Sequence, residues 1–284
     1  MKKQETIQVK HSGDMKDDER DWVQDPVYPP ATSPLHFFNE GSVVHGAIYV
    51  AQGAGPNPCL IMTPEVGGYE RLTSLFVPLC MAGISVAYFY PRGMWDTRET
   101  YTLDGALSDL KQMVTYLKSP AVTAKFRIDT DRIVLGGMSG GGGTLSLIAA
   151  AEDPTLRYVM AVTPYNFSAE RTMTEVPGAR EMTEDSYRRM DMNMDIPEAV
   201  RKRLSIIPRA SEFVGKTLLI LNGSQDTFNP VEVGHKPIVD ALRSAGVAKL
   251  TDVILDSGHS LLTRRPELER LVKAWLRDEC GFRC

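Results

Sequence analysis

The chain has 284 residues, of which 43% are hydrophobic and 24% are charged, and its formal net charge is −4. This composition is typical of a soluble globular protein, and one large domain with a sizeable core would account for the length. The sequence contains no block of basic residues, so nothing in it points to nucleic acid or to an anionic membrane surface as a partner.

The N-terminal lysines are not followed by an apolar stretch, so we expect no secretory signal. No apolar run approaches the roughly 18 residues of a membrane helix, and we therefore expect a cytoplasmic protein without a membrane partner. The four cysteines lack the spacing of a disulfide framework or a zinc site, although a pair between Cys280 and Cys284 remains open.

Residues 1–35 are expected to form an N-terminal arm that is partly disordered. Residues 1–20 are mostly polar with charges of both signs, and residues 21–35 contain four prolines, which favour an extended segment laid over the domain surface. The globular domain is expected to occupy residues 36–284.

From residue 36 onward, apolar runs of strand length alternate with helical patterns. Most of the runs are continuous, as in strands that are buried on both faces of a parallel sheet. The order predicts an α/β fold with a mostly parallel central sheet flanked by helices, and with the first strands forming an antiparallel hairpin at one edge. The expected strands are 43–51, 59–64, 84–91, 132–138, 157–164, 217–224 and 250–257, and the expected helices are 70–82, 103–117, 144–151, 231–244 and 266–276.

Residues 165–213 interrupt this alternation. The segment is too long for a plain connection, so we expect a helical cap or lid inserted into the domain. Its methionines suit either an adaptable apolar surface above a site or ordinary filling of a helical core, and both interpretations stay open. These methionines are Met173, Met182, Met190, Met192 and Met194.

A run of glycines surrounds one serine in GGMSGGGGT, residues 136–144. Ser139 follows a predicted strand and precedes a predicted helix, and its neighbours match G-x-S-x-G, a tight turn that holds the serine oxygen out. Ligands bind beyond the carboxyl ends of the strands in such sheets, so Ser139 is a candidate nucleophile. Gly142 and Gly143 have no part in this chemistry, and we attribute them to close packing of the helix on the sheet.

A serine hydroxyl needs a base, usually a histidine that a carboxylate orients. In this type of fold the carboxylate and then the histidine follow the serine along the chain. His259 lies in a loop directly after a predicted strand, whereas His235 lies within a helical pattern, so His259 is the better candidate. Asp226 ends an intervening strand and is the candidate carboxylate, with Asp240, Asp252 and Asp256 less well placed.

Two backbone N–H groups are expected to stabilise a developing oxyanion. Gly140 supplies one of them, because it follows the serine. Val66, in the loop after the strand at 59–64, supplies the other. Glu65 is interpreted as a brace that pairs with an arginine such as Arg92, in preference to a proton-transfer group.

The substrate site and the need for a cofactor are less well marked in the sequence. We expect no metal and no other cofactor, because E-x-x-H occurs only once, at Glu232 and His235, and H-E-x-x-H is absent. The residues expected to line the substrate site are Glu65, Tyr69, Trp95, Met138 and Tyr165.

Residues 40–277 resemble α/β-hydrolases of the dienelactone hydrolase and prolyl-oligopeptidase-like group. The matching segments are GAIYVAQGAGPNPCLIMTPEVGG, YPRGMWDT, DRIVLGGMSGGGG, LNGSQDTFNP and LDSGHS. The resemblance implies Ser139 as nucleophile, Asp226 and His259 as its partners, and an oxyanion hole at Val66 and Gly140. Dienelactone hydrolases carry cysteine as nucleophile, and esterases usually carry His-Gly in the loop that holds Val66.

These patterns favour a serine esterase that cleaves a small carboxylic ester or lactone through an acyl-enzyme. A peptidase or amidase with the same three residues is the alternative. A binding protein of the same fold without activity is a third hypothesis, but such proteins typically lose one of the three residues. The oligomeric state is not predicted.

Overall fold

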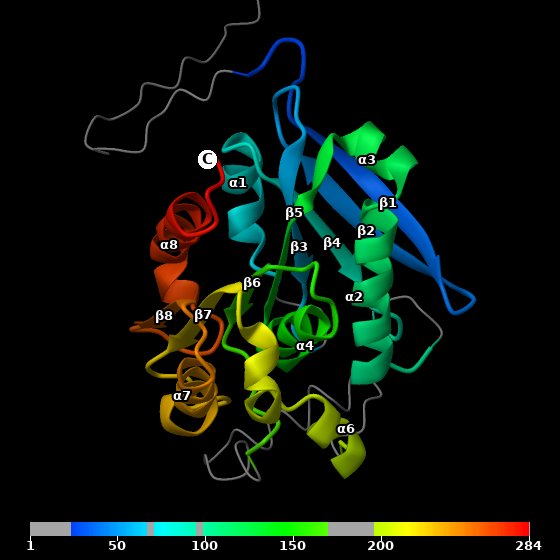
Figure 1. Ribbon diagram of the computed structural model, residues 1–284. Coiled ribbons are helices and arrows are strands. Elements are labelled where there is room, and N and C mark those ends of the chain that lie inside the picture. The colour runs from blue at the N-terminus through cyan, green and yellow to red at the C-terminus, as the bar shows by residue number, and fades with distance from the viewer. Residues whose placement is uncertain (1–23, 67–70, 95–98, 170–195, 284) are drawn as a thin grey trace, which may run out of the picture.

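A computed structural model describes residues 24–66, 71–94, 99–169 and 196–283 of the chain, which fold around one central sheet (Figure 1). The sheet has eight strands in the order β1-β2-β4-β3-β5-β6-β7-β8. β1 and β2 are antiparallel, as are β2 and β4, and all further pairs are parallel. The strands are β1 (Ala31–Asn39), β2 (Ser42–Val50), β3 (Asn57–Thr63), β4 (Ser85–Tyr90), β5 (Ile128–Met138), β6 (Tyr158–Val162), β7 (Thr217–Gly223) and β8 (Lys249–Leu255).

Helices cover both faces of this sheet (Figure 1). α1 (Phe76–Met81) and α8 (Arg265–Asp278) pack on one face. The other face carries α2 (Leu103–Leu117), α3 (Pro120–Phe126), α4 (Leu145–Glu152) and α7 (Lys236–Ser244). The remaining elements are α6 (Glu198–Arg203), the short 3₁₀ segments η1 (Thr73–Leu75), η3 (Ile207–Phe213) and η5 (Leu262–Arg264), and the π-helical turns η2 (Gly140–Thr144) and η4 (Val231–His235). The fold class predicted from the sequence is confirmed.

The predicted strands of the parallel part match the observed ones closely. All seven residues of β7, TLLILNG, are buried, as a continuous apolar run in a central parallel strand requires. β5 is longer than predicted because it begins at Ile128 and includes the polar residues 129–131.

The N-terminal edge of the sheet differs from the expectation. β1 begins at Ala31, ahead of the boundary expected at residue 35, and it joins β2 through a turn at Glu40 and Gly41, both with positive φ. An edge strand tolerates a proline such as Pro34, since its outer N–H groups bond to no strand. The antiparallel hairpin is therefore β1–β2, and the strand predicted at 59–64 instead lies between β4 and β5.

The insertion at 165–213 is described only at its two ends. Phe167, Leu204, Ile206 and Phe213 are buried against the same core as α4 and α7. The five methionines singled out in the sequence lie outside the described residues. No helix in the described part of the chain is long and apolar enough to cross a membrane.

Candidate active site

Ser139 occupies a strained turn between β5 and α4. Its backbone has φ 61° and ψ −162°, a region that residues with a side chain rarely adopt. The π-helical turn η2 follows at once and leads into α4. The strained strand-to-helix turn expected from G-x-S-x-G is present, and Ser139 itself is partly exposed.

The glycines after Ser139 are explained by close approach of neighbouring backbone. A methyl group on Gly142 would lie 2.2 Å from the carbonyl oxygen of Thr63 at the end of β3. On Gly143 it would lie 3.0 Å from the carbonyl oxygen of Val162 at the end of β6. The start of the helix thus packs closely against the ends of β3 and β6, as expected from the sequence.

The loop after β3 also reaches the serine turn. A methyl group on Gly141 would lie 2.5 Å from the backbone nitrogen of Val66. The backbone of both predicted oxyanion donors, Val66 and Gly140, therefore lies beside the same turn. Gly140 in turn lies against the side chains of Tyr165 and Phe167, where an added methyl group would lie 3.3 and 3.4 Å from their nearest atoms.

Asp226 and His259 meet in the loops that follow β7 and β8. His259 Nδ1 lies 2.7 Å from Asp226 Oδ2. The other oxygen of the aspartate, Oδ1, accepts the backbone N–H groups of Phe228 at 2.9 Å and Asn229 at 2.8 Å. The Asp226 side chain is fully buried, whereas that of His259 is 14% exposed. The carboxylate is therefore held in place, and the imidazole is the partly exposed member of the pair.

All three candidate residues belong to the same edge of the sheet. Ser139 follows the carboxyl end of β5, and Asp226 and His259 follow the carboxyl ends of β7 and β8. Two other non-glycine residues with positive φ, Thr163 and Leu261, also lie just beyond strands at this edge. Backbone strain gathers at sites where geometry serves function.

A second histidine–aspartate pair lies away from this edge. His235 Nε2 is 2.6 Å from Asp252 Oδ1, and Arg243 binds the other oxygen of the same carboxylate at 2.9 Å. Asp252 pairs in register with Ile220 in the body of the sheet. His235, the last residue of η4, is 1% exposed, so this pair links η4 to β8 and cannot meet a substrate from solvent.

The predicted substrate-binding residues lie in different environments. Tyr165 lies beside Gly140, and its ring packs edge-on against Phe167 with centroids 4.9 Å apart. Met138 is fully buried in the core beneath α1 and α8. Its interpretation as a substrate contact is therefore corrected, because the side chain at this position of β5 lies on the sheet face that these helices cover. Glu65 is partly exposed, and Tyr69 and Trp95 lie outside the described residues.

Sequence reasoning missed two aromatic neighbours of the site. The ring of Phe228 lies 5.3 Å from that of His259, between centroids. Phe167 lies against Gly140, next to the serine. A signal for Phe228 was available, because it follows Asp226 by two residues in a turn whose backbone must wrap around the carboxylate.

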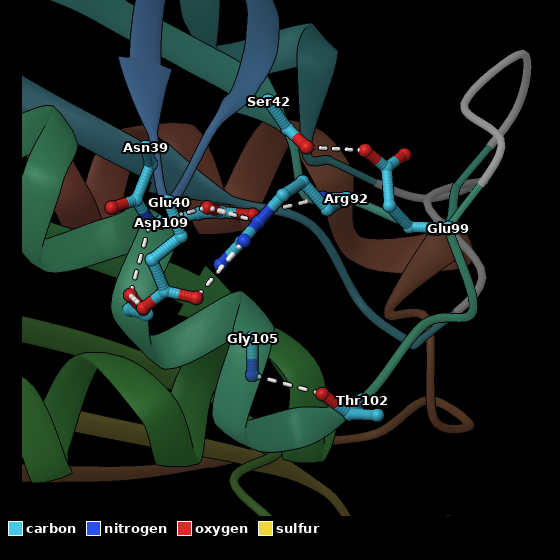
Figure 2. A network of polar contacts seen from close by, with 9 residues as sticks. Asn39, Glu40, Ser42, Arg92, Glu99, Thr102, Gly105 and Asp109 are labelled. Carbon is cyan, nitrogen blue, oxygen red and sulfur yellow. Dashed lines mark hydrogen bonds and ion pairs between the residues drawn. The ribbon is translucent and has the colours of Figure 1, made fainter.

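Arg92 braces the segment that follows β4 (Figure 2). Its backbone N–H and its Nε bind the buried Asp109 of α2 at 2.8 and 2.9 Å, and its Nη1 binds Glu40 at 3.0 Å. Burial raises the pKa of Asp109, although hydrogen bonds from Arg92 and Asn39 oppose the shift. The described partners of Arg92 are thus Asp109 and Glu40, which tie the β1–β2 turn to α2.

Comparison with solved structures finds many chains of the same fold. A 2,6-dihydroxy-pseudo-oxynicotine hydrolase matches with a TM-score of 0.64 at 20% identity, covering 90% of this chain and 70% of that one. An esterase of Pyrococcus furiosus matches with a TM-score of 0.64 at 16% identity, covering 92% and 93%. An acylaminoacyl peptidase of Pyrococcus horikoshii matches with a TM-score of 0.62 at 14% identity. That match covers 86% of this chain but only 40% of the peptidase.

Sequence comparison gives the family. A search of curated proteins found no match. The model of the prolyl oligopeptidase family matches residues 77–282, which include the serine turn, Asp226 and His259. Together with the mostly parallel sheet, this match makes the chain an α/β-hydrolase and a serine hydrolase: it belongs to the prolyl oligopeptidase family.

Proposed function

We propose that the protein hydrolyses a carboxylic ester or lactone through an acyl-enzyme on Ser139. The observation that carries the proposal is the 2.7 Å contact between His259 and the buried Asp226, at the sheet edge that also bears the strained Ser139 turn. A histidine held by a buried carboxylate is the base that a serine nucleophile requires.

The residues divide the reaction among them. His259 takes the proton of Ser139 as its oxygen attacks the carbonyl carbon, and Asp226 stabilises the imidazolium that results. The N–H groups of Val66 and Gly140 stabilise the oxyanion. The imidazolium then gives its proton to the leaving alcohol, and a water molecule, activated by the same imidazole, releases the acid and restores Ser139.

Amide or peptide hydrolysis is the second candidate, and two observations favour it. The family is named for an oligopeptidase, and solved structures with the same fold include an acylaminoacyl peptidase. Both reactions use the same three residues and differ in the leaving group, an amine being the poorer one. The same purified enzyme can therefore be tested for both.

The test uses p-nitrophenyl esters of short and bulky acids, a set of lactones, and amino-acid p-nitroanilides, each with the wild type and with Ser139→Ala. We expect ester turnover that falls about 10⁴-fold to 10⁶-fold in Ser139→Ala, without a change in the denaturation midpoint. Anilide turnover exceeding ester turnover would replace the esterase proposal by the peptidase. A Ser139→Ala protein that keeps more than a tenth of the activity would reject both.

A further inference from the structure

Asn229 joins three parts of the candidate site, although its side chain touches neither Ser139 nor His259 in any described contact. The residue is fully buried. Its backbone N–H donates to Asp226 Oδ1 at 2.8 Å, and its Nδ2 donates to the carbonyl oxygen of Pro164 at 2.9 Å. Its own carbonyl oxygen accepts Nδ2 of the buried Asn222 at 3.0 Å. Asn229 thereby anchors the loop that carries Asp226 through both its backbone and its side chain.

Pro164 connects this anchor to the serine turn. It follows the end of β6, the strand that lies between β5 and β7. A methyl group on Gly143 would lie 3.3 Å from the Cα atom of Pro164, so the start of the helix after Ser139 packs against this residue. A continuous series of contacts therefore runs from the nucleophile turn through Pro164 and Asn229 to Asp226.

The amide of Asn229 is also confined from its other side. A methyl group on Gly234, in η4, would lie 1.9 Å from Asn229 Oδ1. That oxygen is buried, and no residue of the described chain donates a hydrogen bond to it. A buried acceptor without a donor is unfavourable, so stability alone does not explain an amide here. The bond to Pro164 fixes where the loop sits.

We propose that Asn229 is a positioning residue that holds Asp226 in place relative to the Ser139 turn. This inference rests on the proposed function, because it assigns Asn229 a role in supporting His259 during hydrolysis. The imidazolium forms only along the reaction path. A displaced carboxylate therefore reduces the stabilisation of the transition state and leaves substrate binding unchanged. A displacement of about 1 Å can lower the rate about a hundredfold.

The test measures kcat and KM of Asn229→Ala on the best ester substrate, with active sites counted by fluorophosphonate labelling taken to completion. We expect kcat per active site to fall between about tenfold and a hundredfold, with KM within about twofold of the wild type. A role in folding alone would lower the number of active sites and the denaturation midpoint, but not kcat per active site.

Gly234→Ala is the second variant, because it displaces the Asn229 amide while keeping the residue itself. Like Asn229→Ala, it should lower kcat per active site. Ser85→Ala is the matched control. Ser85 is fully buried at the amino end of β4, where its Oγ accepts the N–H of Ala51 at 3.0 Å. Its loss should lower the denaturation midpoint without changing kcat or KM.

The outcomes separate this inference from the proposed function. Turnover that is lost in Ser139→Ala but stays within twofold of the wild type in Asn229→Ala overturns the role of Asn229 alone. Turnover or labelling that survives Ser139→Ala rejects the proposed function. A rise in KM with kcat unchanged in Asn229→Ala would make the residue part of substrate binding and overturn the positioning role.

Discussion

Two histidine–aspartate pairs of nearly equal length show how little a single distance says about a residue. The Nδ1 contact of His259 with Asp226 is 2.7 Å, and the Nε2 contact of His235 with Asp252 is 2.6 Å. The first pair lies beyond the strand ends and its imidazole is partly exposed, whereas the second links η4 to β8 and its imidazole is buried.

This difference predicts opposite effects of the same substitution. His259→Ala should lower kcat about 10⁴-fold or more, because it removes the base proposed for Ser139, and the other candidate, His235, is buried away from this edge. His235→Ala should leave kcat within about threefold and lower the free energy of unfolding by about 1–3 kcal/mol, because the partly buried Asp252 carboxylate loses its hydrogen bond to a buried imidazole. Ester kinetics and urea denaturation of both proteins check this. Equal losses of kcat would contradict the assignment.

At the scale of elements, the serine turn depends on how closely η2 approaches the end of β3. A methyl group on Gly142 would meet the Thr63 carbonyl at 2.2 Å, and backbone cannot rotate away as a side chain would. Gly142→Ala should therefore lower the free energy of unfolding by about 1–3 kcal/mol and reduce kcat by moving Ser139.

Gly105→Ala in α2 is the control for this change. Its nearest contact would be the exposed Thr102 hydroxyl at 3.0 Å, which caps α2 by accepting the N–H of Gly105 and needs to shift by only a few tenths of an ångström. Urea denaturation should show a change of less than about 0.5 kcal/mol, because alanine favours a helix over glycine. A Gly142→Ala protein as stable and as active as the wild type would show that the turn tolerates a side chain.

The elements that sequence patterns predicted are those whose burial follows a regular pattern, either one-sided as in α2 or continuous as in β7. The α2 stripe gave the observed bounds 103–117, and the continuous apolar run of β7 matched to within one residue. β1 was missed because Pro34 and the three prolines that precede the strand resembled a surface arm, although Leu35 and Phe37 alternate with exposed residues as a half-buried strand requires.

The candidate site was predictable where a residue is fixed by its place after a strand. Ser139, Asp226 and His259 follow strand ends and could be named from the sequence alone. Asn229 could not, because its partner Pro164, 65 residues earlier, is brought to it only by the pairing of β6 with β7. Met138 was misread because the direction of a side chain depends on strand phase, which a continuous apolar run conceals.

At the scale of the whole molecule, charged groups tie the helical layer together. Glu152 at the end of α4 binds Lys111 of α2, and binds Arg209 of η3 at 3.1 Å. Burial raises the pKa of Glu152, but the hydrogen bonds and charges of Lys111 and Arg209 outweigh it and leave the pKa below its ordinary value of 4.5. The stabilisation is therefore present above that pH and is lost as the pH falls through the lowered pKa.

Glu152→Gln should accordingly lower the free energy of unfolding by about 1 kcal/mol at pH 7, a modest value because the Lys111 side chain is 45% exposed. The difference from the wild type should shrink below about pH 4. Glu198→Gln in α6 is the control, since both side chains of the Glu198–Lys202 pair are more than 70% exposed. Urea denaturation across this pH range measures both, and a difference that grows at low pH would contradict the assignment.

The strand order also bears on how the protein can be divided for experiments. The family match begins at residue 77, but β4 lies between β2 and β3, and both of these strands precede that residue. A fragment cut at the family boundary would leave β4 with no neighbour on either side and β5 with an open edge. Unpaired strand edges of this kind promote aggregation. Expression trials should therefore begin no later than β1, at Ala31.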